Sequence, residues 1–136
     1  HNVECVPRLD RRVRDRRATF EQSIGILKEA KRLRPDILTK SSIMVGLGET
    51  DTEITEALQM LRDAEVDLVT IGQYLAPSPK HLPVDRFPEP SRYDEWSLQI
   101  EEMGFLGWAC GPLVRSSYRA GELLARASVR LRTAKE

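Results

Sequence analysis

The stretch SIMVGLGETD, Ser42 to Asp51, contains the transition that decides the fold. Ile43 to Val45 is a short continuous apolar run, which is typical of a strand that is covered on both faces. The glycines of GLGET turn the chain, and Asp51 or Thr52 then begins a helix with apolar residues at helical spacing. A strand followed directly by a helix is the repeating unit of a parallel α/β fold.

The same alternation continues on both sides of this stretch. A helix covering FEQSIGILKEAKRL is expected before it, with Thr19 and Gln22 spaced as a capping box and Pro35 ending the helix. The β-branched run VDLVTIGQYL, residues 66–75, is the next predicted strand. The order helix, strand, helix, strand therefore predicts parallel βα units, with the helices on one outer side of the sheet and no closed barrel.

The second half begins with a predicted loop. APSPKHLPVDRFPEP, residues 76–90, contains five prolines, too many for regular structure. A helix is expected from Pro90 or Ser91 to Met103, ended by Gly104. FLGWAC is a further strand candidate, and a last helix is expected over residues 118–134.

The composition limits the class of protein. A chain of 136 residues with 40% apolar and 31% charged residues is expected to form one soluble globular domain. Lysine plus arginine (21) balances aspartate plus glutamate (21), which argues against a nucleic-acid or anionic-membrane surface. The first residues already have the pattern of a structural element, so we expect the chain to be a fragment. Its two cysteines, Cys5 and Cys110, lack metal-type spacing and favour a reducing compartment.

Candidate ligand residues are sought after each strand, because ligands of parallel α/β folds bind at the carboxyl ends of the strands. Glu49 follows the first strand, and Gln73 with Tyr74 follows the second. Asn2 and Glu4 would face the same side if the first residues are another strand end. Each of these signals is equally consistent with packing or turn formation. The lone histidines are not expected to bind metal.

The motif VRSSY presents two adjacent hydroxyl groups. From the residues alone, Ser116 or Ser117 is interpreted as the N-cap of the last helix, because serine is a preferred cap. No catalytic triad follows from the spacing. The residues by themselves predict a ligand-binding parallel α/β fragment.

Four motifs taken in order carry a family resemblance. HNVE.VPRL, K.SIMVGLGETD.E, D..TIGQYL.P...HLPV.R and GPLVRSSY.A strongly resemble the C-terminal portion of the lipoyl synthases, from His1 to about Glu122. The resemblance implies the C-terminal part of a partial (β/α)6 TIM-like radical-S-adenosylmethionine barrel plus a C-terminal extension. Residues 1–110 would supply the barrel units, and residues 111–136 the RSSY segment and final helix.

The resemblance also implies an activity. Lipoyl synthases are sulfurtransferases that insert two sulfur atoms at C6 and C8 of a protein-bound octanoyl group, using S-adenosylmethionine and two 4Fe–4S clusters, one radical and one auxiliary. The cysteine triplets that hold these clusters lie upstream of the matching part, so this chain alone is expected to be inactive. Two alternatives remain: a truncated, non-catalytic binding fragment that keeps part of the S-adenosylmethionine pocket, and a fragment of an unrelated TIM-type aldolase.

Partners and compartment follow from the same resemblance. The implied partners are the octanoylated lipoyl domain of 2-oxoacid dehydrogenase subunits or the glycine cleavage H protein, and an electron donor such as ferredoxin or flavodoxin. No nucleic acid and no membrane are expected. The implied location is the cytoplasm, with the mitochondrial matrix as the alternative.

Site residues are carried over by matching motifs. The strand motif implies that Met44, Gly46 and Glu49 lie at the adenine side of S-adenosylmethionine, with Gln73 and Tyr74 at the next strand end. Asn2 and Glu4 would lie near its ribose and amino-acid part. Ser116 matches the residue whose oxygen binds an iron of the auxiliary cluster. Arg115 would hold charge near the cluster or substrate, and Ser117 would keep the capping role.

Overall fold

The computed structural model describes residues 1–134 of the chain. A short 3-10 turn, Pro7–Leu9, and a one-turn helix, α1 (Asp10–Val13), precede the main elements. The remaining elements alternate along the chain: α2 (Phe20–Leu33), β1 (Lys40–Val45), α3 (Asp51–Asp63), β2 (Leu68–Gln73), α4 (Pro90–Glu102), β3 (Gly107–Gly111) and α5 (Ala120–Thr133). The expected order of helices and strands is confirmed.

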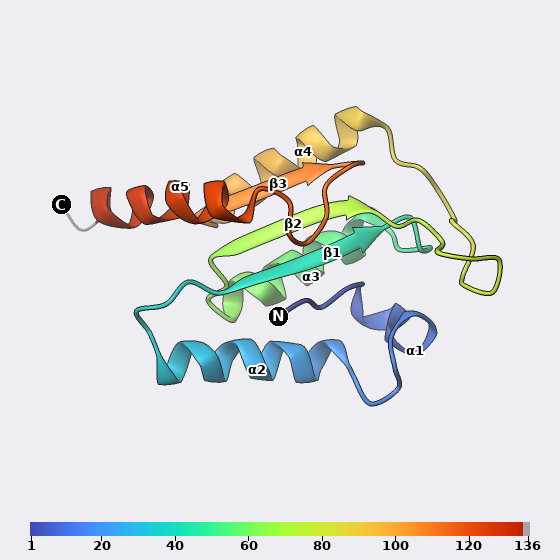
Figure 1. Cartoon of the computed structure of the whole chain (residues 1–136), viewed down its shortest axis with the longest axis horizontal. Coiled ribbons are helices and arrows are strands. Elements are labelled where there is room, and N and C mark those ends of the chain that lie inside the picture. The colour runs from blue at the N-terminus through green and yellow to red at the C-terminus, as the bar shows by residue number, and fades with distance from the viewer. Residues whose placement is uncertain (135–136) are drawn as a thin grey trace.

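The three strands form one parallel sheet in the order β1-β2-β3. Ser42 is paired with Thr70, and Thr70 is paired with Ala109, so the carboxyl ends of the strands lie together (Figure 1). The N-terminal segment lies beside the free edge of β1, where the Glu4 N–H donates to the Ser42 carbonyl at 3.1 Å and the Glu4 carbonyl accepts from the Met44 N–H at 2.8 Å. The mixed α/β class with parallel strands is thus confirmed, on a small sheet.

Helices α2, α3 and α4 cover one face of the sheet and enclose the hydrophobic core (Figure 1). Alternate strand residues, such as Ile43 and Ile71, point into this core and are fully buried. The three helices contribute these side chains, among others, to the core: Phe20, Ile24, Leu27, Ile54, Leu58, Leu61, Tyr93, Trp96 and Ile100.

The opposite face of the sheet carries small and polar residues. The Thr70 hydroxyl donates to the Ser42 hydroxyl across β1 and β2 at 2.8 Å, and glycines follow at the ends of β2 and β3. Helix α5 packs on β3 from this face, where an added Cβ at Gly107 would lie 3.4 Å from the Leu123 carbonyl oxygen. The expectation of helices on one side only is therefore wrong for α5, because small residues on β3 let this helix approach.

The helix termini follow local chemistry. The Thr19 hydroxyl accepts from the Gln22 N–H at 3.1 Å, so half of the expected capping box forms. A full capping box forms between Thr50 and Glu53, and the helix begins at Asp51, as expected. Helix α4 begins at Pro90, and Gly104 follows its end with a φ of +87°.

The start of α5 differs from the expectation. The residue before the helix is Arg119, in the left-handed conformation with φ +43°, and no side chain caps it. Neither Ser116 nor Ser117 is the N-cap, because the serines lie in a turn that ends before the helix begins. The capping interpretation of both serines is therefore wrong. Within residues 1–134, no helix combines the length and the apolarity that crossing a membrane needs.

Candidate functional site

A groove of about 190 Å³ lies on the open face of the sheet, toward the carboxyl ends of β1 and β2. Three parts of the chain form it: the N-terminal segment, the strand ends and the loop after β3. Five of the residues singled out from the sequence line it together: Glu4, Met44, Gln73, Arg115 and Ser116. The chain therefore brings the RSSY motif next to the strand ends that the fold class predicts as a ligand site.

The loop after β3 lies flat on the sheet. An added Cβ on Gly72 would lie 2.1 Å from the Val114 carbonyl oxygen, so the backbone of residue 114 rests directly on β2. A glycine inside a strand often marks such a close approach of another backbone. Residues 112–117, which we call the cover segment, thus form one wall of the groove.

Two cations hold the cover segment. The Lys40 ammonium, at the beginning of β1, donates to the Ser116 carbonyl oxygen. The Arg115 guanidinium turns back to the Val114 carbonyl at 3.0 Å and the Gln73 carbonyl at 3.4 Å. Burial lowers the pKa of Lys40, because the charged form is partly removed from water.

The two serine hydroxyls are not used by the fold. Ser116 and Ser117 are exposed, and among residues 1–134 neither hydroxyl has a hydrogen-bond partner. The backbone of Ser116 is held by Lys40 while its side chain is available. This arrangement presents a hydroxyl at the edge of the groove.

Glu49 lies under the turn rather than in the groove. Its carboxylate accepts from the Gly46 N–H at 2.7 Å and from the Leu47 N–H at 2.9 Å, and only 1% of its side chain is exposed. The turn places Gly46 at a φ of +96°, which glycine adopts without strain. The Arg86 guanidinium contacts the same Glu49 carboxylate at 3.4 Å. The sequence placed Glu49 correctly at a strand end, but its carboxylate binds backbone N–H groups.

Gln73 and Tyr74 are likewise engaged within the fold. The Gln73 amide donates to the Tyr74 carbonyl at 3.0 Å and the Arg86 carbonyl at 3.1 Å, and its oxygen accepts from the Tyr93 hydroxyl at 3.3 Å. The Tyr74 hydroxyl donates to the Leu82 carbonyl at 2.9 Å. These polar groups fasten the proline-rich loop to the end of β2.

Met44 joins the groove to a second, more apolar hollow. This hollow has a volume of about 450 Å³ and lies under the proline-rich loop, with Met44, Leu47 and Tyr74 on its inner wall. Arg12, Lys80 and His81 lie at its rim. Among the predicted site residues of the described chain, Met44 lines both spaces, whereas Tyr74 lines the hollow but not the groove.

Of the two N-terminal candidates, Glu4 lines the groove and Asn2 does not. Glu4 lines the groove in the left-handed conformation, with φ +71°, which interrupts the alternation of a regular strand. Asn2 is half-buried and lines neither the groove nor the hollow. The first residues do not form a regular strand, so the condition under which Asn2 and Glu4 were expected to face the same side is not met.

The two cysteines are free thiols, buried at Cys5 and half-buried at Cys110. Burial and the nearby Asp10 raise the pKa of the Cys5 thiol to about 12, and burial raises the pKa of Cys110 to about 11. Both thiols are therefore less easily ionised than an ordinary cysteine. Within the described residues, no group of three or more His, Cys, Asp or Glu could hold a metal ion.

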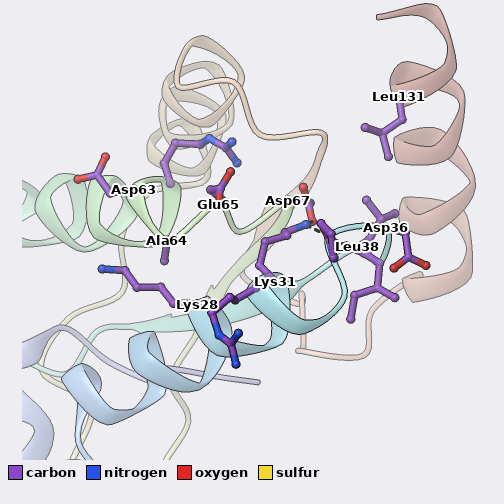
Figure 2. A pocket seen from close by; sticks show the side chains of 13 residues that line it. Lys28, Lys31, Asp36, Leu38, Asp63, Ala64, Glu65, Asp67 and Leu131 are labelled. Carbon is purple, nitrogen blue, oxygen red and sulfur yellow. Dashed lines mark hydrogen bonds and ion pairs between the residues drawn. The ribbon is translucent and has the colours of Figure 1, made fainter. Parts of the chain in front are cut away.

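Another hollow, of about 510 Å³, lies at the opposite end of the sheet. Figure 2 shows it between the ends of α2, α3 and α5, with the Lys31 ammonium 2.5 Å from the Asp67 carboxylate. Its basic and acidic residues balance, and none of the residues singled out from the sequence lines it. The amino ends of parallel strands typically serve stability, so this hollow is not the candidate site.

Sequence reasoning missed Lys40 and Gly72. A lysine at the start of a strand carries no distinctive signal, and its partner lies 76 positions further along the chain. Gly72, the glycine in TIGQY, did carry a signal in the sequence. Glycine weakens a strand, so its presence inside one suggests that another backbone approaches closely there.

Comparison with known proteins identifies the relatives of the chain, although no family model matches it. It is 50% identical to the mitochondrial lipoyl synthase of Xenopus laevis over 99% of its own length, and 54% identical to the chloroplastic lipoyl synthase of Arabidopsis thaliana over 96%. It is 57% identical to the lipoyl synthase of Halorhodospira halophila over 91%. These matches cover 36%, 33% and 37% of the relatives, so the chain spans about a third of their length. The chain is therefore similar, over nearly its whole length, to a part of the lipoyl synthases.

Proposed function

We propose that this chain is part of a lipoyl synthase, a sulfurtransferase that inserts two sulfur atoms at C6 and C8 of a protein-bound octanoyl group. The observation that carries the proposal is the 50–57% identity to lipoyl synthases over 91–99% of the chain. The groove supports it, because the RSSY motif and the strand-end motifs contribute to a single space. The truncated binding fragment and the aldolase fragment have no observation in their favour.

The described residues fit one ligand of an iron–sulfur cluster. The Ser116 hydroxyl is exposed at the groove edge and has no partner among residues 1–134, as a replaceable oxygen ligand requires. The two cysteines do not fit, because they lack metal-type spacing and, among residues 1–134, no group of three or more His, Cys, Asp or Glu could hold a metal ion. We therefore assign the cluster cysteines to sequence outside this chain. When bound, the clusters and S-adenosylmethionine supply the radical that removes hydrogen and the sulfur that replaces it.

The apolar hollow fits the adenosyl part of S-adenosylmethionine. Met44 and Leu47 offer apolar contact to it. Glu49 and Gln73 act on this pocket by holding its walls, since their polar groups bind the turn after β1 and the proline-rich loop. Glu4 and Asn2 are proposed to lie toward the ribose and amino-acid part, and Gly46 to let the backbone approach closely.

Arg115 is proposed to keep positive charge beside the groove. Its guanidinium contacts only carbonyl oxygens among the described residues, so its charge is not neutralised by a carboxylate there. A cluster with thiolate ligands is anionic, and a nearby cation stabilises it. This supports the electrostatic role expected of Arg115.

The sheet is proposed to be part of a partial (β/α)6 barrel. Parallel strands with α2, α3 and α4 on the outer face are the arrangement such a barrel requires. Residues 1–110 would then be barrel units, and residues 111–136 the segment that covers the barrel opening. The last two residues of that range lie outside the described part.

The proposed partners are an octanoylated lipoyl domain and an electron donor of the ferredoxin or flavodoxin type. The relatives named mitochondrial and chloroplastic support an organelle, and thus the mitochondrial alternative rather than the cytoplasm.

The test is an assay of the complete protein that contains this chain. The protein, reconstituted with iron and sulfide under anaerobic conditions, is mixed with S-adenosylmethionine, a reductant and an octanoylated lipoyl domain. We expect mass spectrometry to detect a carrier that has gained two sulfur atoms. A protein with intact clusters that cleaves S-adenosylmethionine without adding sulfur would contradict the proposal.

A further inference from the structure

We propose that Lys40 and Gly72 are positioning residues that hold the cover segment, residues 112–117, against the sheet and so fix where the Ser116 hydroxyl is presented. This inference rests on the proposed role of Ser116 as an iron ligand and adds the residues that place it. Both residues belong to strands, whereas Ser116 lies in a loop.

Gly72 provides the flat surface on which the segment rests. The Val114 carbonyl oxygen would lie 2.1 Å, and the Val114 carbonyl carbon 3.1 Å, from a Cβ at this position. Both atoms are backbone and cannot rotate away as a side chain can. The φ of Gly72 is not among the positive values, so alanine suits the strand conformation itself. Any side chain at this position must therefore lift the cover segment away from β2.

Lys40 fixes the other end of the contact. Its ammonium reaches the Ser116 carbonyl and is the donor of no other hydrogen bond among residues 1–134. The side chain is half-buried, so its charge depends on this acceptor for part of the solvation it has lost. A charge-assisted hydrogen bond of this kind is stronger than one between neutral groups.

Arg115 adds a third attachment between the two. Its guanidinium contacts the Gln73 carbonyl of β2 as well as the Pro112 and Val114 carbonyls of the cover segment. The main chain around Ser116 is thus attached to β1 by Lys40 and to β2 by Gly72 and Arg115. Because none of these contacts uses the Ser116 side chain, they leave its hydroxyl available for a ligand.

These attachments would preorganise the Ser116 hydroxyl for binding a metal ion. A ligand that is already held in place loses little entropy when it binds a metal, whereas a mobile loop must be ordered first. Removing either attachment should therefore loosen the segment in the absence of any cluster, and weaken iron binding in its presence.

The experiment uses the complete protein and two variants, Gly72→Ala and Lys40→Met. Each has a matched control. Gly111→Ala lies on the same face beside Gly72, but its Cβ meets only a Val114 methyl group at 3.4 Å. Lys28→Met removes an exposed lysine from α2. Lys40→Arg keeps the charge and the donor and is the rescue variant.

The first readout is amide hydrogen exchange in the cluster-free protein. The Val114 N–H donates to the Gly111 carbonyl at 3.1 Å and the Tyr118 N–H to the Arg115 carbonyl at 2.9 Å, so both report on the segment. We expect both amides to exchange at least about tenfold faster in Gly72→Ala and Lys40→Met, with strand amides unchanged. The two controls and Lys40→Arg should match the unmodified protein. Unchanged exchange in both variants would overturn the proposal.

The second readout is Mössbauer spectroscopy of the reconstituted protein. We expect a smaller fraction of cluster iron with a non-thiolate ligand in both variants, and a normal fraction in the controls. Faster exchange with an unchanged iron signature would support the seating of the segment but overturn the ligand role of Ser116. Failure of the positioning proposal and failure of the ligand role of Ser116 therefore give different results.

Discussion

At the scale of single residues, the strongest difference between sequence and structure concerns polar groups at strand ends. The position of Glu49 was predictable from the strand-turn-helix pattern, but its use was not. Its carboxylate accepts from the Gly46 and Leu47 N–H groups, a bond pattern set by the local turn and invisible in residue type. Ser116 shows the opposite case, because its neighbours predicted a cap and the structure leaves its hydroxyl without a partner among residues 1–134.

The cysteines allow a test by pH at the same scale. Because Cys110 has a pKa of about 11 against the ordinary 9.0, the folded protein keeps this proton as pH rises. At pH 8 the thiolate fraction is about a hundredfold lower than in the unfolded chain, and the thiolate is the reactive form. We expect iodoacetamide to alkylate Cys110 about a hundredfold more slowly in native protein than in urea, measured by peptide mass spectrometry.

The raised pKa of Cys110 also determines how the stability of the folded protein changes with pH. Between pH 9 and pH 11 the unfolded chain loses the Cys110 proton while the folded chain retains it, so the free energy of unfolding should fall as pH rises. In the alkylation test, rapid reaction of Cys110 with iodoacetamide in the native protein at pH 8 would show that the thiol is exposed, and would contradict its burial.

At the scale of elements, local signals predicted the helices well and their first residues less well. Helices α2 and α4 begin and end near the residues that capping and glycine signals indicate. For α3 the expected start at Asp51 or Thr52 is confirmed, because the helix begins at Asp51; the Thr50 hydroxyl caps it by accepting from the Glu53 N–H at 3.2 Å. For α5 the serines suggested a start near residue 118, but the attachment of the cover segment to the sheet delays the helix to Ala120.

The cap of α3 gives a stability prediction. Thr50→Ala removes the capping box and should lower the free energy of unfolding by about 1 kcal/mol. Thr52→Ala is the control, because Thr52 is exposed within the first turn and should change stability little. The measurement is urea unfolding of the protein, and equal losses in the two variants would rule out the capping role of Thr50.

At the scale of the whole molecule, the parallel arrangement was predictable because strands and helices alternate along the chain. The packing of α5 and the cover segment on the second face was not, since it depends on contacts between residues far apart in sequence, such as Lys40 and Ser116. The result is a sheet with one face enclosed by helices and one face partly covered by the chain's own C-terminal part (Figure 1). That second face contains the groove that five of the candidate site residues line.

The central claim is that this chain supplies the serine ligand of a sulfur-donating cluster, and Ser116→Ala in the complete protein tests it most directly. Lipoyl product and 5′-deoxyadenosine are measured together, with Ser117→Ala as the control because its hydroxyl is equally exposed. We predict that Ser116→Ala loses lipoyl product and retains cleavage of S-adenosylmethionine, since the radical cluster is separate. Ser117→Ala should retain both activities and full stability. Full lipoyl product from Ser116→Ala, or equal loss in both variants, would contradict the account.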